Sequence, residues 1–272
     1  MRKYSIGVFD SGFGGLEVLK EIVQTLPQYN YIYLGDTKRA PYGNRSQAQI
    51  YQFTQQAVDF LFRKNCFLVV LACNTSSSEA LRRIQQEYLP KHYPQRRVLG
   101  VVVPAAEEAA LLTKNKKIGV IATKATVSSF AFKRELTKLS PKIKVFQQAC
   151  PLLVPLVEEG KHNLPTTHAV LKIYLAPLLK VGIDILILGC THYGLLEKQI
   201  KQIVGLEVKV VSEGNIVALK LKDYLLRHPE IETRLVSESK LSFLTTGKVV
   251  KFKELASLFY GKAISPQQVI LK

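Results

Sequence analysis

The sequence predicts an α/β protein built from two similar parallel-sheet domains. Two continuous apolar runs, 68–72 and 185–189, each give way to small polar residues at a cysteine, Cys73 and Cys190. Runs of this length and composition are typical of strands buried on both faces in a parallel sheet. A helical pattern follows each cysteine, and alternating strands and helices favour parallel pairing. We therefore expect both thiols at the carboxyl ends of strands, where open α/β sheets bind ligands.

An internal repeat indicates that there are two domains. The first half opens with Ile-Gly-Val at 6–8 and reaches Cys73, and the second opens with Ile-Gly-Val at 118–120 and reaches Cys190. The repeat that these segments define is too long for the repeating unit of a solenoid protein. It fits a duplicated domain better, with the two copies facing each other across a cleft.

The segments between these strands carry helix signals, namely a glycine turn, a Ser-x-x-Glu capping box, a proline beside acidic residues, and an apolar stripe. The predicted helices begin near Gly15, Ser76, Pro104 and Leu196. The tail beyond residue 208 supplies another strand and a helix from about residue 216, and is expected to return to the first domain. We expect residues 1–98 with 211–272 to form one domain and residues 99–210 the other.

Composition favours a globular cytoplasmic protein. The chain of 272 residues is long enough for two domains. Its first residues lead into a strand without the apolar region of a signal peptide, and no apolar segment is long enough to span a bilayer. The four cysteines form no CxxC pair, so neither a disulfide framework nor a zinc ribbon is indicated. Cys66 and Cys150 are expected to be packed, unreactive thiols.

The net charge of +17 has two interpretations. It is compatible with a nucleic-acid partner. However, lysine and arginine are scattered over nearly every predicted helix and loop, and their short clusters are not interleaved with aromatic residues. A solvated basic surface without a nucleic-acid partner is therefore favoured, and its field would help to attract a small acidic substrate.

The positions of the two thiols point to acid–base chemistry. A helix N-terminus favours a thiolate, and an ordinary thiol has a pKa of about 8.5, so modest stabilisation would make it a usable base. Asp10 ends the first strand and is either a turn residue or a neighbour of Cys73 that orients a proton carrier or receives an ammonium group.

Two further residues are candidates for assisting Cys190. His192 follows it by two positions and is either a structural histidine or a partner of the thiol. Glu158 and Glu159 end an apolar stretch, so either one of them points into a cleft or both lie at a solvated helix end.

The remaining motifs do not indicate a metal or a nucleotide. Cys190-x-His192 has no second ligand pair at zinc spacing, so no metal site is expected. The glycine loop 10–15 lacks the last glycine of the dinucleotide fingerprint, and no Walker lysine is present. It is interpreted as a tight turn near a small anion. The loop 35–43 is either a simple turn or a segment that closes over a ligand.

Five segments together resemble one family. They are Phe9–Leu16, Gly35–Gly43, Ala72–Thr75, Ile118–Thr123 and Gly189–Tyr193. Their order and sequences are similar to those of the glutamate racemases in the aspartate/glutamate racemase family, which use two cysteines and no cofactor.

The resemblance implies two flavodoxin-like domains, related by a pseudo-two-fold axis, with the active site in the cleft between them. It implies interconversion of L- and D-glutamate, with D-glutamate supplied for peptidoglycan, and a homodimer. Cys73 and Cys190 would be the proton carriers, Asp10 would assist Cys73, and His192 and Glu158 would assist Cys190. The implied substrate contacts are Asp10, Ser11, Tyr42, Gly43, Asn74, Thr75, Thr126, Thr191 and His192.

The chain departs from the family pattern at Ala122, at the serines 76–78, at Gly194 and in the segment 212–214. None of these changes removes a proposed catalytic group. Three alternatives remain open: a racemase of aspartate or a hydantoin, a basic nucleic-acid-binding protein, and a thiol redox protein. The last is weakened by the absence of CxxC.

Overall fold

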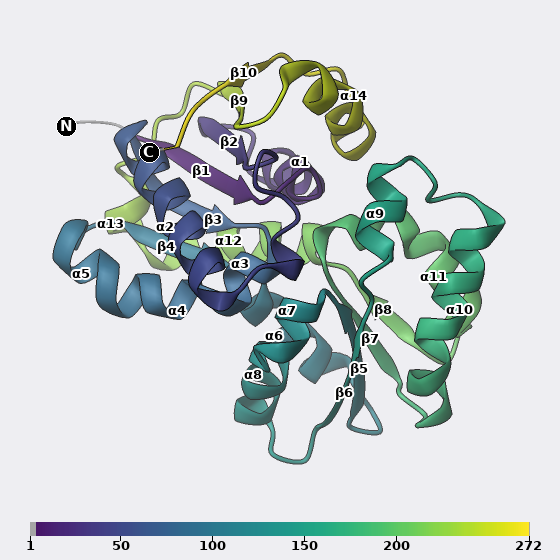
Figure 1. Ribbon diagram of the computed structural model, residues 1–272. Coiled ribbons are helices and arrows are strands. Elements are labelled where there is room, and N and C mark those ends of the chain that lie inside the picture. The colour runs from purple at the N-terminus through teal and green to yellow at the C-terminus, as the bar shows by residue number, and fades with distance from the viewer. Residues whose placement is uncertain (1–3, 272) are drawn as a thin grey trace.

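The computed structural model describes residues 4–271, which form two lobes with one parallel sheet each (Figure 1). The first sheet has the strand order β10-β9-β2-β1-β3-β4, and the second has the order β6-β5-β7-β8. The strands of the first sheet are β1 Ser5–Asp10, β2 Tyr31–Gly35, β3 Cys66–Leu71, β4 Arg97–Gly100, β9 Leu241–Thr245 and β10 Pro266–Gln268. Those of the second are β5 Lys117–Ala122, β6 Lys144–Ala149, β7 Ile185–Gly189 and β8 Lys209–Val211.

The two sheets repeat one topology. Four neighbouring strands of the first sheet, β2-β1-β3-β4, have the same spatial order as the four strands of the second sheet, β6-β5-β7-β8. All of these pairs are parallel. The predicted α/β class is confirmed, and the repeated order supports a duplication. Cys73 follows β3 and Cys190 follows β7, so the two thiols occupy equivalent positions.

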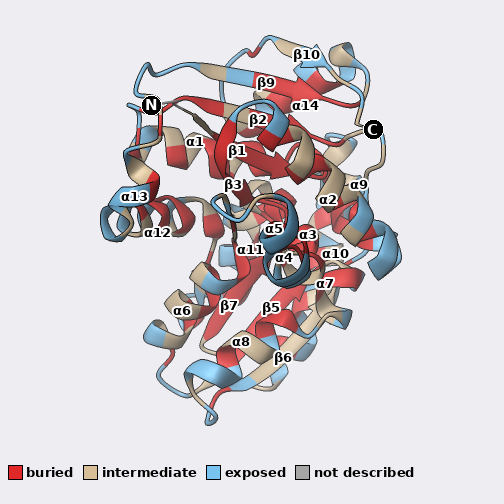
Figure 2. Ribbon diagram, turned by 90° about the vertical axis from the view of Figure 1, so that its left-hand side faces the viewer, coloured by how far each residue is buried: buried red, intermediate tan, exposed pale blue. Residues whose placement is uncertain are grey.

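Apolar composition explains why these strands are central. Every residue of β3 and of β7 is buried. Figure 2 shows β1, β3, β5 and β7 in the colour of buried residues, with exposed segments around them. Because both faces of these strands are covered by helices, the sequence shows continuous apolar runs instead of alternation.

Helices cover both sheets. The first lobe contains α1 Gly15–Thr25, α2 Gln47–Arg63, α3 Asn74–Glu79, α4 Leu81–Arg83, α5 Leu89–His92, α13 Pro229–Glu232 and α14 Val249–Tyr260, with the 3₁₀ turn η1 Tyr42–Asn44 and the π-helical turn η2 Ile84–Tyr88. The second contains α6 Val102–Leu112, α7 Lys124–Ser128, α8 Ala131–Leu139, α9 Leu153–Glu158, α10 Pro165–Lys180, α11 Glu197–Val204 and the 3₁₀ segment η3 Thr191–Leu196.

The helix α12 Glu213–Arg227 follows β8 of the second sheet and packs against α1 and α6, so it contacts both lobes. After it the chain returns to the first lobe, where β9 pairs with β2. This return of the tail was expected from the sequence. The lobes are thus connected by the passage from β4 to α6 and by α12.

Two predicted helix starts are wrong by two residues. Instead of a capping box at Ser76, the helix α3 begins at Asn74, because the Cys73 sulfur itself accepts a hydrogen bond from the Ser76 N–H at 3.5 Å. The other helix, α6, begins at Val102 and not at Pro104. Proline is tolerated there because first-turn N–H groups have no partner within the helix.

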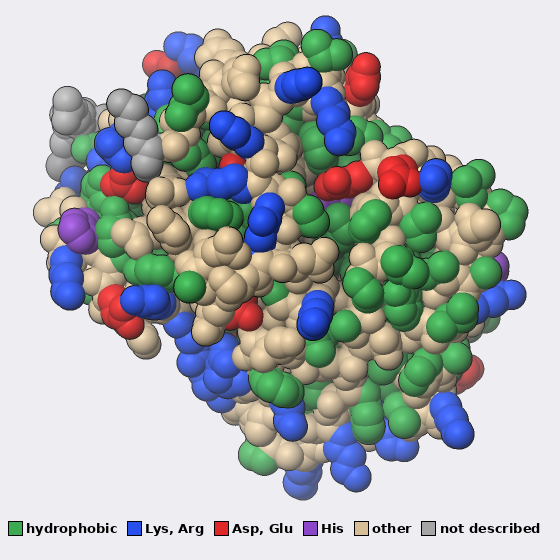
Figure 3. Space-filling view, viewed as in Figure 1, with side chains coloured by type: hydrophobic (Ala, Val, Ile, Leu, Met, Phe, Trp, Pro, Cys, Tyr) green, Lys and Arg blue, Asp and Glu red, His purple; other side chains and the backbone are tan. Residues whose placement is uncertain are grey.

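Basic side chains are spread over both lobes on the face shown in Figure 3, with apolar and acidic side chains among them. The arrangement on this face agrees with the solvated-surface interpretation of the charge. Within residues 4–271, no helix combines the length and the apolar character that crossing a membrane requires.

Truncating a core leucine should destabilise the fold. Leu186 in β7 is fully buried, so Leu186→Ala should lower the free energy of unfolding by about 2–5 kcal/mol through lost burial and a cavity. Leu206→Ala is the matched control, because Leu206 is fully exposed and the change should stay within about 0.5 kcal/mol. Urea denaturation measures both, and equal losses would contradict this account of the core.

Candidate active site

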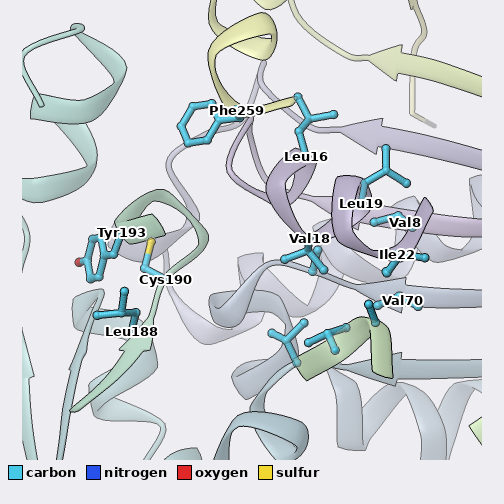
Figure 4. Packing of buried hydrophobic residues seen from close by; sticks show 14 of the residues in the cluster. Val8, Leu16, Val18, Leu19, Ile22, Val70, Leu188, Cys190, Tyr193 and Phe259 are labelled. Carbon is cyan, nitrogen blue, oxygen red and sulfur yellow. The ribbon is translucent and has the colours of Figure 1, made fainter. Parts of the chain in front are cut away.

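The two thiols line one cavity between the lobes. Cys73 and Cys190 are only 5% and 7% exposed. The cavity is lined by residues of both lobes: Ser11, Gly12, Ala40, Pro41, Tyr42, Gly43, Cys73, Asn74, Thr75, Thr123, Val154, Glu158, Cys190, Thr191 and His192. Figure 4 shows Cys190 beside Tyr193 on the segment that follows β7, with Phe259 of the first lobe nearby. The structure therefore brings together the thiols that are far apart in the sequence.

Asp10 connects the lobes at this cavity. Its buried carboxyl accepts a hydrogen bond from the Gly12 N–H at 2.7 Å. Its other oxygen accepts one from the Thr191 hydroxyl at 3.2 Å, and Thr191 directly follows Cys190. Beside it, the Ser11 hydroxyl lies 3.3 Å from the Cys73 sulfur. Asp10 is thus placed between the segments that carry the two thiols.

His192 and Glu158 lie on the Cys190 side of the cavity. The His192 Nδ1 is 3.9 Å from the Cys190 sulfur, and its Nε2 is 3.1 Å from Glu158 Oε1. The Glu158 side chain is 21% exposed and lines the cavity, whereas Glu159 points to solvent and pairs with Lys161. Of the two glutamates considered from the sequence, Glu158 is the one in the cleft.

Three threonine hydroxyls form a polar cluster on the Cys73 side. Thr75 Oγ1 lies 3.0 Å from Thr123 Oγ1 and 3.4 Å from Thr126 Oγ1, so the cluster spans both lobes. Thr75 follows Cys73 by two residues, and Thr123 directly follows β5 of the other lobe. Sequence reasoning named Thr75 and Thr126 and missed Thr123, although its position at the end of a central strand was a usable signal.

Two glycines allow the lobes to approach each other. A Cβ at Gly14 would lie 2.4 Å from Thr191 Oγ1, and one at Gly43 would lie 2.7 Å from the Cβ of Thr123. The glycine loop 10–15 is therefore needed for close packing between lobes. The loop 35–43 contributes its last four residues to the wall of the cavity.

Tyr42 is positioned by Asp36, a residue that the sequence analysis did not single out. Its hydroxyl donates a hydrogen bond to the buried Asp36, which also accepts one from Thr246 at 2.7 Å and pairs with Arg39 at 2.6 Å. Because Asp36 follows β2, it occupies the same sheet edge as Asp10. Asp36 thus holds the Tyr42 hydroxyl beside the cavity that Tyr42 lines.

The expectation of a stabilised thiolate is wrong for this structure. Burial raises the pKa of Cys73, and the nearby Asp10 raises it further, against hydrogen bonds from Ser11 and Ser76 that lower it. Burial also raises the pKa of Cys190 well above its usual range. Desolvation of the charged form outweighs the helix terminus, and Cys190 precedes only a 3₁₀ segment.

Unlike Cys73 and Cys190, the other two cysteines, Cys66 and Cys150, do not line the cavity. Burial raises the pKa of Cys66 and of Cys150 to about 12. Both are free thiols packed in the lobes, as expected. No cluster of three or more histidine, cysteine or acidic side chains suited to a metal occurs among residues 4–271.

The cavity is small. Its volume is ≈ 20 Å³, which is about the space of one or two water molecules. A larger hollow of ≈ 370 Å³ lies elsewhere, lined by parts of α6, α8 and α12, and neither thiol reaches it. Size therefore does not identify the site; the convergence of two thiols, Asp10, His192 and Glu158 does.

Such a site defines a two-thiol acid–base enzyme built on a duplicated α/β fold. The Asp/Glu/Hydantoin racemase family matches residues 6–219. Glutamate racemase 2 of Caldanaerobacter subterraneus subsp. tengcongensis is 41% identical over 262 residues, covering 95% of this chain and 94% of the relative. The glutamate racemase of Bacillus cereus is 40% identical, with 96% and 94% covered. The chain therefore belongs to the Asp/Glu/hydantoin racemase family.

Solved structures agree with this assignment. Glutamate racemase isoform RacE1 from Bacillus anthracis superposes with a TM-score of 0.91 and 36% identity, covering 100% of this chain and 99% of that one. The glutamate racemase from Francisella tularensis, solved in complex with D-glutamate, superposes with a TM-score of 0.89 and 32% identity, covering 100% of this chain and 99% of that one. The aspartate racemase of Picrophilus torridus, at 16% identity and a TM-score of 0.55, shares the fold alone.

The raised thiol pKa values predict slow alkylation at neutral pH. Because only the thiolate reacts with iodoacetamide, the rates at Cys73 and Cys190 should be low at pH 7 and rise as the pH passes the ordinary thiol range. Peptide mass spectrometry gives the rate at each cysteine, with glutathione as the reference thiol. Modification of either one at the reference rate or faster at pH 7 would contradict the inferred environment.

Proposed function

We propose that the two thiols catalyse the interconversion of L- and D-glutamate by removing and returning the α-proton. The observation that carries this proposal is the placement of Cys73 and Cys190 at equivalent strand ends of two lobes, on one cavity. The family membership and the glutamate racemases among its relatives support the same reaction.

The mechanism follows from having two acid–base groups on one cavity. Cys73 as thiolate takes the α-proton of one enantiomer, which leaves a carbanion-like carbon and a neutral Cys73 thiol. The Cys190 thiol then donates its proton to the opposite face, so that the configuration is inverted and Cys190 becomes the thiolate. The reverse reaction exchanges the roles, and each turnover leaves the number of protons on the protein unchanged.

We propose that the bound substrate itself favours the thiolate. Both thiols resist ionisation because they are buried near Asp10. An α-ammonium group bound near Asp10 would place a positive charge beside them and favour a thiolate. The Ser11 hydroxyl and the Ser76 N–H already point to the Cys73 sulfur and would stabilise its negative charge. His192, held by Glu158, would play the matching part at Cys190.

The polar wall of the cavity fits a substrate with two carboxylates. The Thr75 and Thr123 hydroxyls line the cavity and can donate to carboxylate oxygens, and such charge-assisted bonds are the stronger kind. Of the other proposed contacts, Asp10 and Thr126 are fully buried and do not line the cavity. Those on its wall are Ser11, Tyr42, Gly43, Asn74, Thr191 and His192. Because the cavity is much smaller than glutamate, we expect the lobes to separate to admit it, with bending at the β4–α6 and α12 connections.

Several further expectations belong to the same proposal. The division into residues 1–98 with 211–272 and residues 99–210 stays a proposal. Because β4 pairs in the first sheet as far as Gly100 and β8 pairs in the second as far as Val211, each boundary lies slightly further along the chain. We propose that the protein forms a homodimer, works in the cytoplasm and supplies D-glutamate for peptidoglycan. Light scattering tests the dimer, and restored growth of a D-glutamate auxotroph tests the physiological role. An aspartate racemase remains the alternative to test by direct turnover.

The α-proton should exchange with solvent during racemisation. Incubation of the wild-type protein with L-glutamate in D₂O should produce D-glutamate with deuterium at the α position, because each proton is returned from a solvent-exchanged thiol. Replacing either base, as in Cys73→Ser or Cys190→Ser, should lower kcat at least about 100-fold, the scale of losing one acid–base group. Optical rotation and NMR measure the two outcomes.

The matched control is Cys66→Ala, which removes a buried thiol far from the cavity and should leave kcat within about threefold of wild type. Racemisation that survives both serine replacements would contradict the two-base mechanism. Turnover of aspartate without turnover of glutamate would replace the proposed substrate and keep the mechanism.

A further inference from the structure

A buried acid–amide contact lies directly behind Cys73. Asn74, the first residue of α3, is 2% exposed, and Glu213, the first residue of α12, is 5% exposed. Asn74 Nδ2 donates a hydrogen bond to Glu213 Oε2 at 2.8 Å. Glu213 does not line the cavity, so this contact ties a cavity residue to the helix that packs against both lobes.

Each of these two side chains has one atom without a partner. Among the described residues 4–271, Glu213 Oε1 and Asn74 Oδ1 are buried and make no hydrogen bond. If Glu213 were ionised, both atoms would be acceptors, and neither could satisfy the other. A buried polar atom without a partner is costly, so two in one contact require an explanation.

A proton on Glu213 Oε1 would give both unpartnered atoms a hydrogen bond. A neutral carboxylic acid has one O–H donor as well as its acceptor oxygen. With Oε2 already accepting from the amide N–H, the O–H on Oε1 is the group that can donate to Asn74 Oδ1. The two unpartnered atoms are thus the pair that a cyclic acid–amide contact would join.

The charges around Glu213 favour this neutral form. Burial raises its pKa well above the usual range, and the carboxyls of Glu17 on α1 and Asp10 on β1 raise it further. The hydrogen bond from Asn74 acts in the opposite direction and is the smaller effect compared with burial. The charge of Glu213 would also oppose ionisation of the Cys190 thiol, so the two groups disfavour each other's charged form.

We infer that Glu213 is a positioning residue that, as a protonated acid, holds Asn74 in a two-bond pair and thereby fixes the turn carrying Cys73. This role rests on the proposed function of Cys73. The pair connects the start of α12 to the residue next to the thiol, so the position of Cys73 depends on the packing of α12 between the lobes.

Substitution by glutamine separates this inference from a role of the charged carboxylate. Glu213→Gln keeps the size and offers one donor and one acceptor, so it reproduces both bonds and should retain kcat within about threefold. Glu213→Met removes both bonds and leaves the Asn74 amide unsatisfied, so kcat should fall about tenfold or more. Glu21→Gln, on the neighbouring surface of α1, is the matched control and should match wild type.

Infrared spectroscopy supplies a readout independent of turnover. At pH 7 the wild type should show the carbonyl stretch of a protonated carboxyl that is missing from Glu213→Gln, and circular dichroism should show that each variant is folded. The inference is overturned if this band is absent, if Gln is as impaired as Met, or if folded Met matches wild type. A wild type that does not racemise glutamate refutes the proposed function and the positioning role, while the band still reports the pair.

Discussion

The buried carboxyl of Asp10 is the interaction on which the geometry of the site depends. It lies at the carboxyl end of β1, accepts the Gly12 N–H from its own loop and accepts the Thr191 hydroxyl from the other lobe. Cys190 immediately precedes Thr191, and Ser11 beside Asp10 contacts Cys73. Asp10 and its neighbour Ser11 therefore contact both thiol-bearing segments. The glycines at 14 and 43 permit this closeness because any side chain there would collide with the opposite lobe.

The small, desolvated cavity has two opposing effects on thiol chemistry. It disfavours a resting thiolate, which is why the pKa values of Cys73 and Cys190 are raised. It also strengthens every interaction with a charge that enters, because little water remains to screen it. A zwitterionic substrate thus brings the charge that activates the base, and closure of the lobes makes that charge effective. We therefore expect the bound substrate to favour the thiolate that takes its proton.

Much of the fold and the centre of the site could be predicted from the sequence, because strand burial and strand ends leave local patterns. The runs before Cys73 and Cys190 are the clearest examples, and Asp10, His192 and Glu158 fall where their positions suggested. The features that were not predicted from the sequence depend on contacts between residues far apart in the chain. No local pattern reveals that Thr123 meets Thr75 or that Glu213 meets Asn74, and desolvation of the thiols arises only when the lobes close.

A crystal structure of the wild-type protein with bound D-glutamate tests the central claim most directly. The account predicts that the α-carbon lies between the sulfur atoms of Cys73 and Cys190, with one sulfur on each face and the ammonium group near Asp10. A complex in which both sulfurs approach the same face of the α-carbon, or in which glutamate binds outside this cavity, would contradict it.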